Sequence, residues 1–549
     1  MERAVAEGQI EVREEARTDQ AARVLEPAAL DVVARLHARL DADRRELLLD
    51  RESRQREYDA GALPGYLPAD DPAARQAASD WRVAPLPADL RRRRVEITGP
   101  ISDPKMVINM LSRTDAGDRA DAAMLDFEDS MKPSWVNVVR GIENLKEAVE
   151  GTLTFSRPGK QGQTAKEYRI DPDDMPLLMV RVRGLHLDES NVTVDGTTVS
   201  AGLFDLTLSA WHTARRLIEQ GKSPKYYVPK CEHYLEARWW NRLFALLEEE
   251  LSLAAGTLRA TFLIETLPAA FQMEEILYEL RERAAGLNVG RWDKIFSDIK
   301  VLREHPDRVL ADRGSISLNR PWMRDYALRL VKICHRHGAF AMGVMSAFTP
   351  GSTAERREEQ TRKVVEDKAF EASMGHDGCW VSHPYFIGPA MSAFSRDHQL
   401  DVVPDIDDRP DLLPRAEGPR TLDGLRKNVR VGIAYMHGWN QDIGCVAWED
   451  LMEDLATLEI SRAQVWQWLR HGVALDDGTI VTRELVHGIF DEEGEQIGFA
   501  DAQVDAEAIF TEPRFRPFLT GRSELAGTDL ETKRARLRVE GTSGTRAPL

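Results

Sequence analysis

From about residue 95 to residue 382, short apolar segments alternate with longer segments in which apolar residues recur at helical spacing. This alternation is typical of β-α units and predicts a parallel sheet covered by helices. The segments predicted as strands are Val95–Thr98, Ala122–Phe127, Leu177–Val182, Tyr226–Val228, Leu258–Ile264, Leu287–Trp292, Phe340–Met345 and Cys379–Ser382. Because eight parallel strands close a (β/α)8 TIM barrel, we expect an α/β fold of that type.

Helical patterns also lie on both sides of the alternating region. In the N-terminal segment, Leu30, Val33, Leu36 and Leu40 recur at helical spacing and predict a helix that ends near Ala60. Further predicted helices are Ala269–Ala285, which ends at Gly286, and Leu422–Trp439 and Ser461–His471.

These patterns predict four parts of the chain. Residues 1–90 are expected to form an N-terminal helical extension, and residues 91–395 the barrel. Residues 396–530 start with a Pro/Asp-rich stretch and continue with helical patterns, so we expect a C-terminal helical domain that caps the barrel. Residues 531–549 have no apolar period and are expected to be a flexible tail.

The charge balance argues against several classes of partner. A net charge of −18 on 549 residues would repel nucleic acid and anionic membrane surfaces at long range. No apolar run approaches the roughly 20 residues that cross a bilayer, and the charged N-terminal segment has no apolar core of a signal peptide. The four cysteines form no C-x-x-C pair, which favours reduced thiols. We therefore expect a cytoplasmic protein, and the sequence leaves its oligomeric state open.

Ionisable residues follow several predicted strands at their C-terminal ends, where barrel enzymes carry their reactive groups. Glu265 and Asp293 follow neighbouring strands without His or Cys nearby, and such a pair of carboxylates suits Mg²⁺. Arg181 ends another strand and offers a permanent positive charge to an oxygen that becomes negative during a reaction. A single acid at a strand end is more often a helix cap or an ion-pair partner, so these residues alone do not decide the function.

Other ionisable residues of these segments leave alternatives open. Asp126 lies near the end of the second predicted strand, and Glu128 and Asp129 follow this strand. Arg183 is either a structural partner of Asp126 or Glu128 or a second substrate contact. His186 is interpreted as a strand-end histidine with its hydrogen bonds satisfied rather than as a catalytic group.

Seven sequence motifs, in order and from about residue 90 to 475, resemble those of malate synthase of the A type. Any one of them would be weak evidence, whereas the ordered set is specific. They are VEITGP (Val95–Pro100), DFEDS (Asp126–Ser130), RVRGLHL (Arg181–Leu187), LIETLPAAF (Leu263–Phe271), GLNVGRWD (Gly286–Asp293), GHDG (Gly375–Gly378) and LMED (Leu451–Asp454).

The resemblance implies a TIM barrel with an N-terminal helical clasp and a C-terminal helical domain that brings a catalytic base to the barrel mouth. It implies an acyltransferase that condenses acetyl-CoA with glyoxylate and hydrolyses the thioester to malate and CoA, as in the glyoxylate cycle. By motif, Arg181 corresponds to the active-site arginine, Glu265 and Asp293 to the Mg²⁺ ligands and Asp454 to the base. Spacing alone did not single out Asp454.

The same resemblance makes two further residues candidates for the metal site. Asp126 and Glu128 are expected to hydrogen-bond water on the Mg²⁺ ion.

Two rival hypotheses are weighed against a synthase. A lyase of the malyl-CoA or citryl-CoA type shares the barrel and the metal site, but resembles a chain of roughly half this length without LMED. A catalytically inert barrel that binds acyl-CoA or glyoxylate would have no reason to keep Arg181, Glu265, Asp293 and Asp454 together. Length and residue content therefore favour the synthase.

Overall fold

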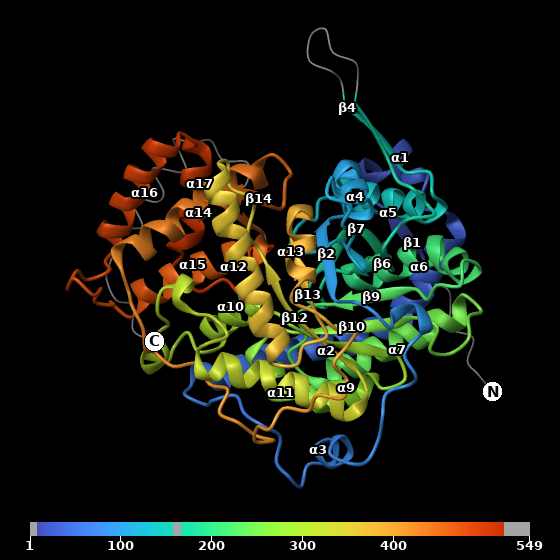
Figure 1. Cartoon of the computed structure of the whole chain (residues 1–549), viewed down its shortest axis with the longest axis horizontal. Coiled ribbons are helices and arrows are strands. Elements are labelled where there is room, and N and C mark those ends of the chain that lie inside the picture. Colours follow the sequence, from blue (N-terminus) through green and yellow to red (C-terminus); the bar gives the residue numbers. More distant parts are fainter. Residues whose placement is uncertain (1–7, 158–165, 521–549) are drawn as a thin grey trace.

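The computed structural model describes residues 8–157 and 166–520. Its centre is a closed parallel barrel of eight strands in the order β2-β3-β6-β9-β10-β11-β12-β13 (Figure 1). The barrel strands are β2 (Val95–Pro100), β3 (Ala122–Asp126), β6 (Leu177–Arg181), β9 (Lys225–Val228), β10 (Arg259–Ile264), β11 (Ala284–Val289), β12 (Phe340–Ser346) and β13 (Gly378–Val381). Each corresponds to one of the predicted strands, so the predicted (β/α)8 barrel is confirmed.

Burial on both faces explains why these strands are apolar almost throughout. Every residue of β2, β3, β9, β10, β11 and β13 is buried, as is typical of a parallel sheet that helices cover. The helices in this region are α4 (Pro104–Leu111), α5 (Trp135–Glu150), α6 (Ala201–Glu219), α7 (Tyr234–Glu250), α8 (Leu267–Ala270), α9 (Met273–Leu280), α10 (Arg291–Val301), α11 (Pro321–His337), α12 (Ala354–Ser373) and α13 (Ile387–Met391).

The predicted helix Ala269–Ala285 is wrong at its C-terminal end. Two short helices, α8 and α9, occupy its first part, but Ala284 already belongs to β11. Gly286 does not end a helix; it lies in the strand, where an added Cβ would approach the carbonyl oxygen of Phe340 to 2.3 Å. Pairing with β12 therefore overrides the helical spacing at this point.

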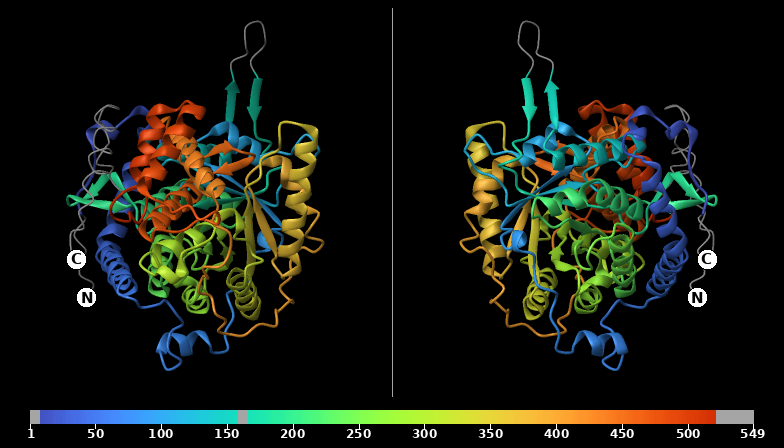
Figure 2. Two further views of the ribbon diagram at one scale, coloured as in Figure 1. Left: turned by 90° about the vertical axis from the view of Figure 1, so that its left-hand side faces the viewer. Right: turned by 90° about the vertical axis from the view of Figure 1, so that its right-hand side faces the viewer.

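The predicted N-terminal helix is confirmed as α2 (Pro27–Asp59), which packs along α6 and α7. Buried ion pairs fix it, since Arg51 donates to both carboxylate oxygens of Glu236 at 2.7 and 2.6 Å. A small sheet and a projecting hairpin were not predicted (Figure 2). The remaining elements here are α1 (Asp19–Ala22), α3 (Pro72–Ala77), the sheet of β1 (Ile10–Val12), β7 (Asp188–Val194) and β8 (Thr197–Ser200), and the hairpin of β4 (Thr154–Arg157) and β5 (Lys166–Arg169).

The C-terminal region is helical and lies beside the barrel in Figure 1. Its helices are α14 (Leu422–Asn440), α15 (Leu455–Arg470), α16 (Arg483–Ile497) and α17 (Ala500–Phe510), and a short hairpin of β14 (Val446–Trp448) and β15 (Leu451–Glu453) precedes α15. A separate apolar cluster, which includes Val429, Trp468 and Phe510, forms its core. The predicted domain boundaries stay predictions, and the predicted tail lies outside the described residues.

The ends of the predicted C-terminal helices differ in accuracy. The helix predicted at Leu422–Trp439 corresponds to α14, whereas the one predicted at Ser461–His471 is the second half of a helix that already begins at Leu455. Among the described helices, none is both long enough and apolar enough to cross a membrane.

Candidate active site

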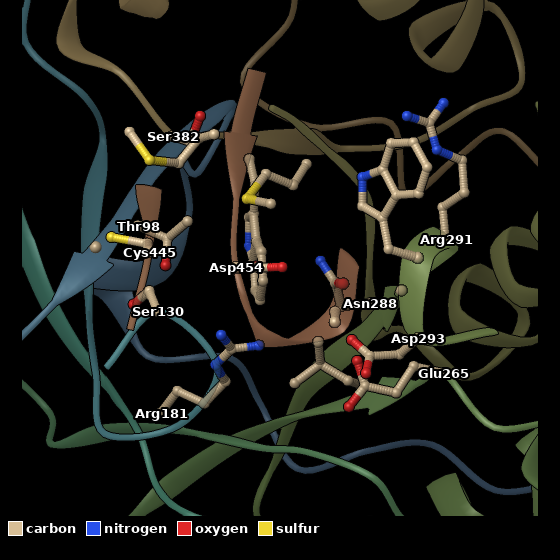
Figure 3. Close-up of a pocket in the computed structure, with 18 of the residues that line it drawn as sticks. Thr98, Ser130, Arg181, Glu265, Asn288, Arg291, Asp293, Ser382, Cys445 and Asp454 are labelled. Carbon is tan, nitrogen blue, oxygen red and sulfur yellow. The ribbon is translucent and has the colours of Figure 1, made fainter. Parts of the chain in front are cut away.

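A pocket of about 680 Å³, partly open to solvent, lies at the C-terminal ends of the barrel strands. It is lined by Arg181 at the end of β6, Glu265 after β10, Asp293 in the first turn of α10 and Asp454 just before α15. Figure 3 shows Arg181 on one side of this pocket and the pair Glu265 and Asp293 on the other. The four residues selected from the sequence therefore come together in one place.

Asp454 is the N-cap of α15, and hydrogen bonds of both its side chain and its backbone fix its position. Its Oδ1 accepts a hydrogen bond from Thr457 N at 3.2 Å, and Thr457 Oγ1 accepts one from Asp454 N at 3.0 Å. This reciprocal capping box explains why the helix starts here. The next residue, Leu455, donates its backbone N–H to Asp129 O at 3.1 Å, which joins the start of α15 to the loop after β3.

The environment of Asp454 makes its carboxylate a stronger base than usual. Burial, with Asp129 and Asp293 nearby, raises the pKa of Asp454 well above its ordinary value, although Arg181 and the N–H of Thr457 act in the opposite direction. Such a carboxylate suits proton abstraction.

Arg181 is held in one orientation. Its Nε and Nη2 donate to Asp126 Oδ1 and Oδ2 at 2.7 and 2.6 Å, and its Cζ lies 5.7 Å from the ring centroid of Trp380. Its third nitrogen, Nη1, lies 3.4 Å from Glu128 Oε2. A bidentate pair of this kind fixes the plane of the guanidinium, so that its charge is directed toward the pocket.

Asp126 and Glu128 have different surroundings. Both oxygens of Asp126 also accept hydrogen bonds from the loop that follows it, at Glu128 N and at Ser130 N and Oγ. Burial raises the pKa of Asp126, but the charge and hydrogen bonds of Arg181, with those of Ser130, outweigh it and lower the pKa. Asp126 thus holds Arg181 in place. The expectation that Asp126 and Glu128 bind water on a metal stays a prediction, and Glu128, whose Oε2 has no hydrogen bond, is the better placed of the two.

Glu265 and Asp293 present free oxygens to the pocket. Glu265 Oε1 accepts a hydrogen bond from Lys230 N at 2.8 Å, while its Oε2 has no partner. Asp293 Oδ1 lies 3.1 Å from Lys230 Nζ but receives no hydrogen bond. Gly290 permits their close approach, because a Cβ there would lie 2.4 Å from Glu265 Cβ. Buried oxygens without partners are unfavourable in a protein unless a cation or water meets them.

Carboxylates outnumber cations in the buried acidic cluster of this site, which consists of Glu128, Asp129, Glu265 and Asp293. Burial and the neighbouring Asp293 raise the pKa of Glu265 well above its ordinary value, and burial and Asp129 do the same for Glu128. A divalent cation would remove this penalty. In residues 8–157 and 166–520, no group of three or more His, Cys, Asp or Glu side chains is arranged to enclose a metal. Two carboxylates with open positions fit Mg²⁺, which keeps several water ligands.

Comparison with known proteins decides the family. Family models of malate synthase match the chain at residues 10–72 (N-terminal domain), 177–408 (TIM barrel domain) and 419–521 (C-terminal). Malate synthase A of Escherichia coli (strain K12) is 40% identical over 522 residues, which cover 91% of this chain and 95% of the relative. Malate synthase of Myxococcus xanthus (strain DK1622) is 44% identical over 519 residues, which cover 91% and 93%. The chain belongs to the malate synthase family.

A solved structure, the magnesium/glyoxylate complex of Haloferax volcanii malate synthase, is also similar, at 15% identity and a TM-score of 0.43. The match covers 76% of this chain and 98% of that chain.

Lys230 contacts the acidic residues of this site and was not selected from the sequence. It follows β9 closely, so the rule that selected Glu265 and Asp293 applies to it as well. Its Nζ donates to Glu128 Oε1 and Asp129 Oδ2, both at 2.7 Å. Lys230 could have been selected from the sequence, but Pro229 separates it from the apolar segment Tyr226–Val228.

The partners predicted for Arg183, Asp126 or Glu128, were wrong. Its guanidinium is fully buried and donates to Asp205 from Nε at 2.9 Å and from Nη2 at 2.7 Å, and to Glu189 from Nη1 at 2.9 Å. Arg183 therefore joins the barrel to α6 and β7 instead of contacting Asp126 or Glu128, and the alternative that it contacts a substrate stays a prediction.

The interpretation of His186 was also wrong in part. Its Nδ1 has no hydrogen-bond partner, and its ring stacks on Phe518 at 4.1 Å between centroids. Burial, together with the charge of Arg51, lowers its pKa well below the ordinary value. His186 is a neutral packing residue of the interface between the barrel and the C-terminal segment, not a histidine with satisfied hydrogen bonds.

Replacing Arg183 with methionine is expected to destabilise the fold by about 3–5 kcal/mol, because the carboxylates of Asp205 and Glu189 would remain buried without their partner. Urea unfolding of the parent protein and of the variant Arg183→Met measures the difference in their free energies of unfolding. A change within about 0.5 kcal/mol, typical of surface sites, would contradict the assigned structural role.

Proposed function

We propose that this chain catalyses the condensation of acetyl-CoA with glyoxylate and the hydrolysis of the resulting thioester to malate and CoA. The observation that carries this proposal is the presence, in one pocket, of a buried carboxylate at the N-terminus of α15, a fixed guanidinium and a pair of carboxylates with free oxygens. Membership of the malate synthase family over 91% of the chain favours this reaction over that of a lyase or an inert barrel.

In this proposal Glu265 and Asp293 hold Mg²⁺. Each residue has one buried oxygen without a hydrogen bond, and carboxylates outnumber cations around them; both observations support this assignment. Bound Mg²⁺ supplies a Lewis acid for the oxygens of glyoxylate. Glu265 contributes Oε2, since its other oxygen is engaged by the backbone of Lys230.

Asp454 removes a proton from the methyl carbon of acetyl-CoA. The acetyl methyl is a weak acid with a high pKa. The raised pKa of Asp454 makes the difference between the pKa of the base and the pKa of the methyl group smaller. Arg181 stabilises the negative charge that develops on the thioester oxygen. The burial of Arg181 and Asp454 strengthens this interaction, because water does not screen it.

The methyl carbon then forms a bond with the aldehyde carbon of glyoxylate while the π bond of the aldehyde C=O breaks, and the aldehyde oxygen takes up a proton, which gives malyl-CoA. Water cleaves the thioester and releases malate and the free thiol of CoA, and this hydrolysis makes the overall reaction irreversible.

The reaction is tested by incubating purified protein with acetyl-CoA, glyoxylate and Mg²⁺ while free thiol and malate are followed. Malate and thiol that rise together, and that stop rising on addition of EDTA, support the synthase. Cleavage of malyl-CoA without release of thiol supports a lyase. Binding of acetyl-CoA or glyoxylate without turnover supports an inert barrel.

Replacing Glu265 with glutamine is expected to raise the Mg²⁺ concentration for half-maximal activity at least about tenfold, because a charged ligand becomes neutral. Activity titrations with Mg²⁺ at saturating substrates measure this shift. Glu275, in the first turn of α9 and buried, is the matched control, since its conversion to glutamine leaves the pocket unchanged. An unchanged Mg²⁺ requirement in the Glu265 variant would remove this residue from the proposed metal site.

The cellular location and the domain roles also belong to this proposal. We place the enzyme in the cytoplasm, without nucleic acid or a membrane as partner; Cys231, Cys334, Cys379 and Cys445 are all free thiols, which agrees with a reducing compartment. Cell fractionation tests the location. In the proposed division, residues 1–90 clasp the barrel and residues 396–530 carry the base.

A further inference from the structure

Lys230 contacts the acidic cluster through both its backbone and its side chain. Its N–H donates to Glu265 Oε1 at 2.8 Å, and its Nζ donates to Glu128 Oε1 and Asp129 Oδ2 at 2.7 Å. The same Nζ lies 3.1 Å from Asp293 Oδ1. One residue thus contacts carboxylates from three separate segments of the chain.

The backbone of Lys230 is also unusual. Its φ is +54°, in the left-handed region that residues other than glycine rarely adopt. Such a conformation persists only where the surrounding contacts enforce it, and these positions gather at functional sites. Lys230 is also 4% exposed, so its ammonium is withdrawn from water and depends on the carboxylates around it.

Electrostatics explain what this arrangement does. Glu128, Asp129, Glu265 and Asp293 would repel one another in a buried space if no cation lay between them. Arg181 fills this role only in part, because Asp126 engages two of its nitrogens and the third, Nη1, lies 3.4 Å from Glu128 Oε2 and 4.0 Å from Asp129 Oδ2. The ammonium of Lys230 is in contact with three of the four carboxylates.

We propose that Lys230 is a built-in counter-cation that holds the acidic cluster together before Mg²⁺ binds and thereby weakens the affinity of the site for Mg²⁺. This inference rests on the proposed metal site at Glu265 and Asp293. Lys230 is a positioning residue. Its ammonium adds a positive charge to the cluster that an incoming divalent cation would bind, and its backbone N–H donates to Glu265 Oε1, which leaves Oε2 without a hydrogen bond.

The test is thermal unfolding of the full chain and of the variant Lys230→Met, without substrates, in EDTA and across a series of Mg²⁺ concentrations. In EDTA the variant is expected to melt at a lower temperature than the parent protein. Mg²⁺ is expected to raise the Tm of the variant by more than that of the parent protein. The apparent Kd for Mg²⁺ should fall about tenfold, because one positive charge has left the cluster.

A residue with a merely structural role gives a different result. If Lys230 only shaped the loop, its loss would weaken Mg²⁺ binding. A rise in the Tm of the variant on addition of Mg²⁺ that is equal to or smaller than the rise in the parent protein would overturn the proposal. Failure of the parent protein itself to respond to Mg²⁺ or to turn over substrates would instead contradict the proposed function.

Two further variants complete the experiment. Lys225→Met is the matched control: Lys225 is buried and paired with Asp89 at 2.5 Å, at the start of β9 and away from the pocket, so Mg²⁺ should not restore its stability. Lys230→Gln keeps a polar side chain without charge and repeats the test if the methionine variant fails to fold. If both Lys230 variants stay unfolded even in Mg²⁺, the proposal is overturned, because the divalent cation should replace the missing charge.

Discussion

Replacement of Asp454 with asparagine is expected to lower kcat by about 10³-fold, within the range that loss of a general base produces. Asparagine has nearly the same shape and caps helices as well as aspartate, so Thr457 N keeps its partner and α15 keeps its start. The Tm of the variant should therefore stay close to that of the parent protein. Steady-state kinetics at saturating acetyl-CoA, glyoxylate and Mg²⁺ measure the effect.

A matched control separates loss of the base from loss of a cap. Asp71 caps α3 through hydrogen bonds from Ala73 N and Ala74 N, far from the pocket, and Asp71→Asn should leave kcat unchanged. Exchange of the acetyl-CoA methyl hydrogens with deuterated solvent gives a second readout. If the Asp454 variant kept a kcat within a few-fold of the parent value, another group would be the base.

Replacement of Arg181 with lysine is expected to lower kcat/KM by at least about 10²-fold, although the charge is kept. A lysine ammonium is a point charge that cannot bind both oxygens of Asp126 while it faces the pocket. The guanidinium plane over Trp380 would also be lost. Kinetics with acetyl-CoA as the varied substrate measure this change.

Arg94 offers the matched control for this prediction. It binds Asp121 in a bidentate pair at 3.0 and 3.2 Å, at the opposite end of the barrel strands. Arg94→Lys should alter stability slightly and leave kcat/KM unchanged. A loss of activity of similar size in both variants would mean that Arg181 acts through the fold and not on the substrate.

The barrel could be predicted from the sequence because each of its strands is buried on both faces and so appears as a short apolar segment. Glu265, Asp293 and Arg181 could be found for a related reason, since strand ends are recognisable and a barrel brings them together. Lys230 obeys the same rule and could have been found.

The remaining features depend on contacts that local spacing does not contain. Asp454 owes its place to the packing of α15 on α10, and only the resemblance to malate synthase singled it out. Arg183 pairs with Asp205 on α6, which no motif indicates. At Ala284, pairing with Ala260 of β10 decided between strand and helix where the spacing favoured the helix.

The hydrogen bond from Leu455 N to Asp129 O joins an early part of the chain to a late one. During synthesis, a ribosome exports the barrel well before it exports α15. A nascent or prematurely terminated chain therefore contains Arg181, Glu265 and Asp293 but not Asp454, the proposed base.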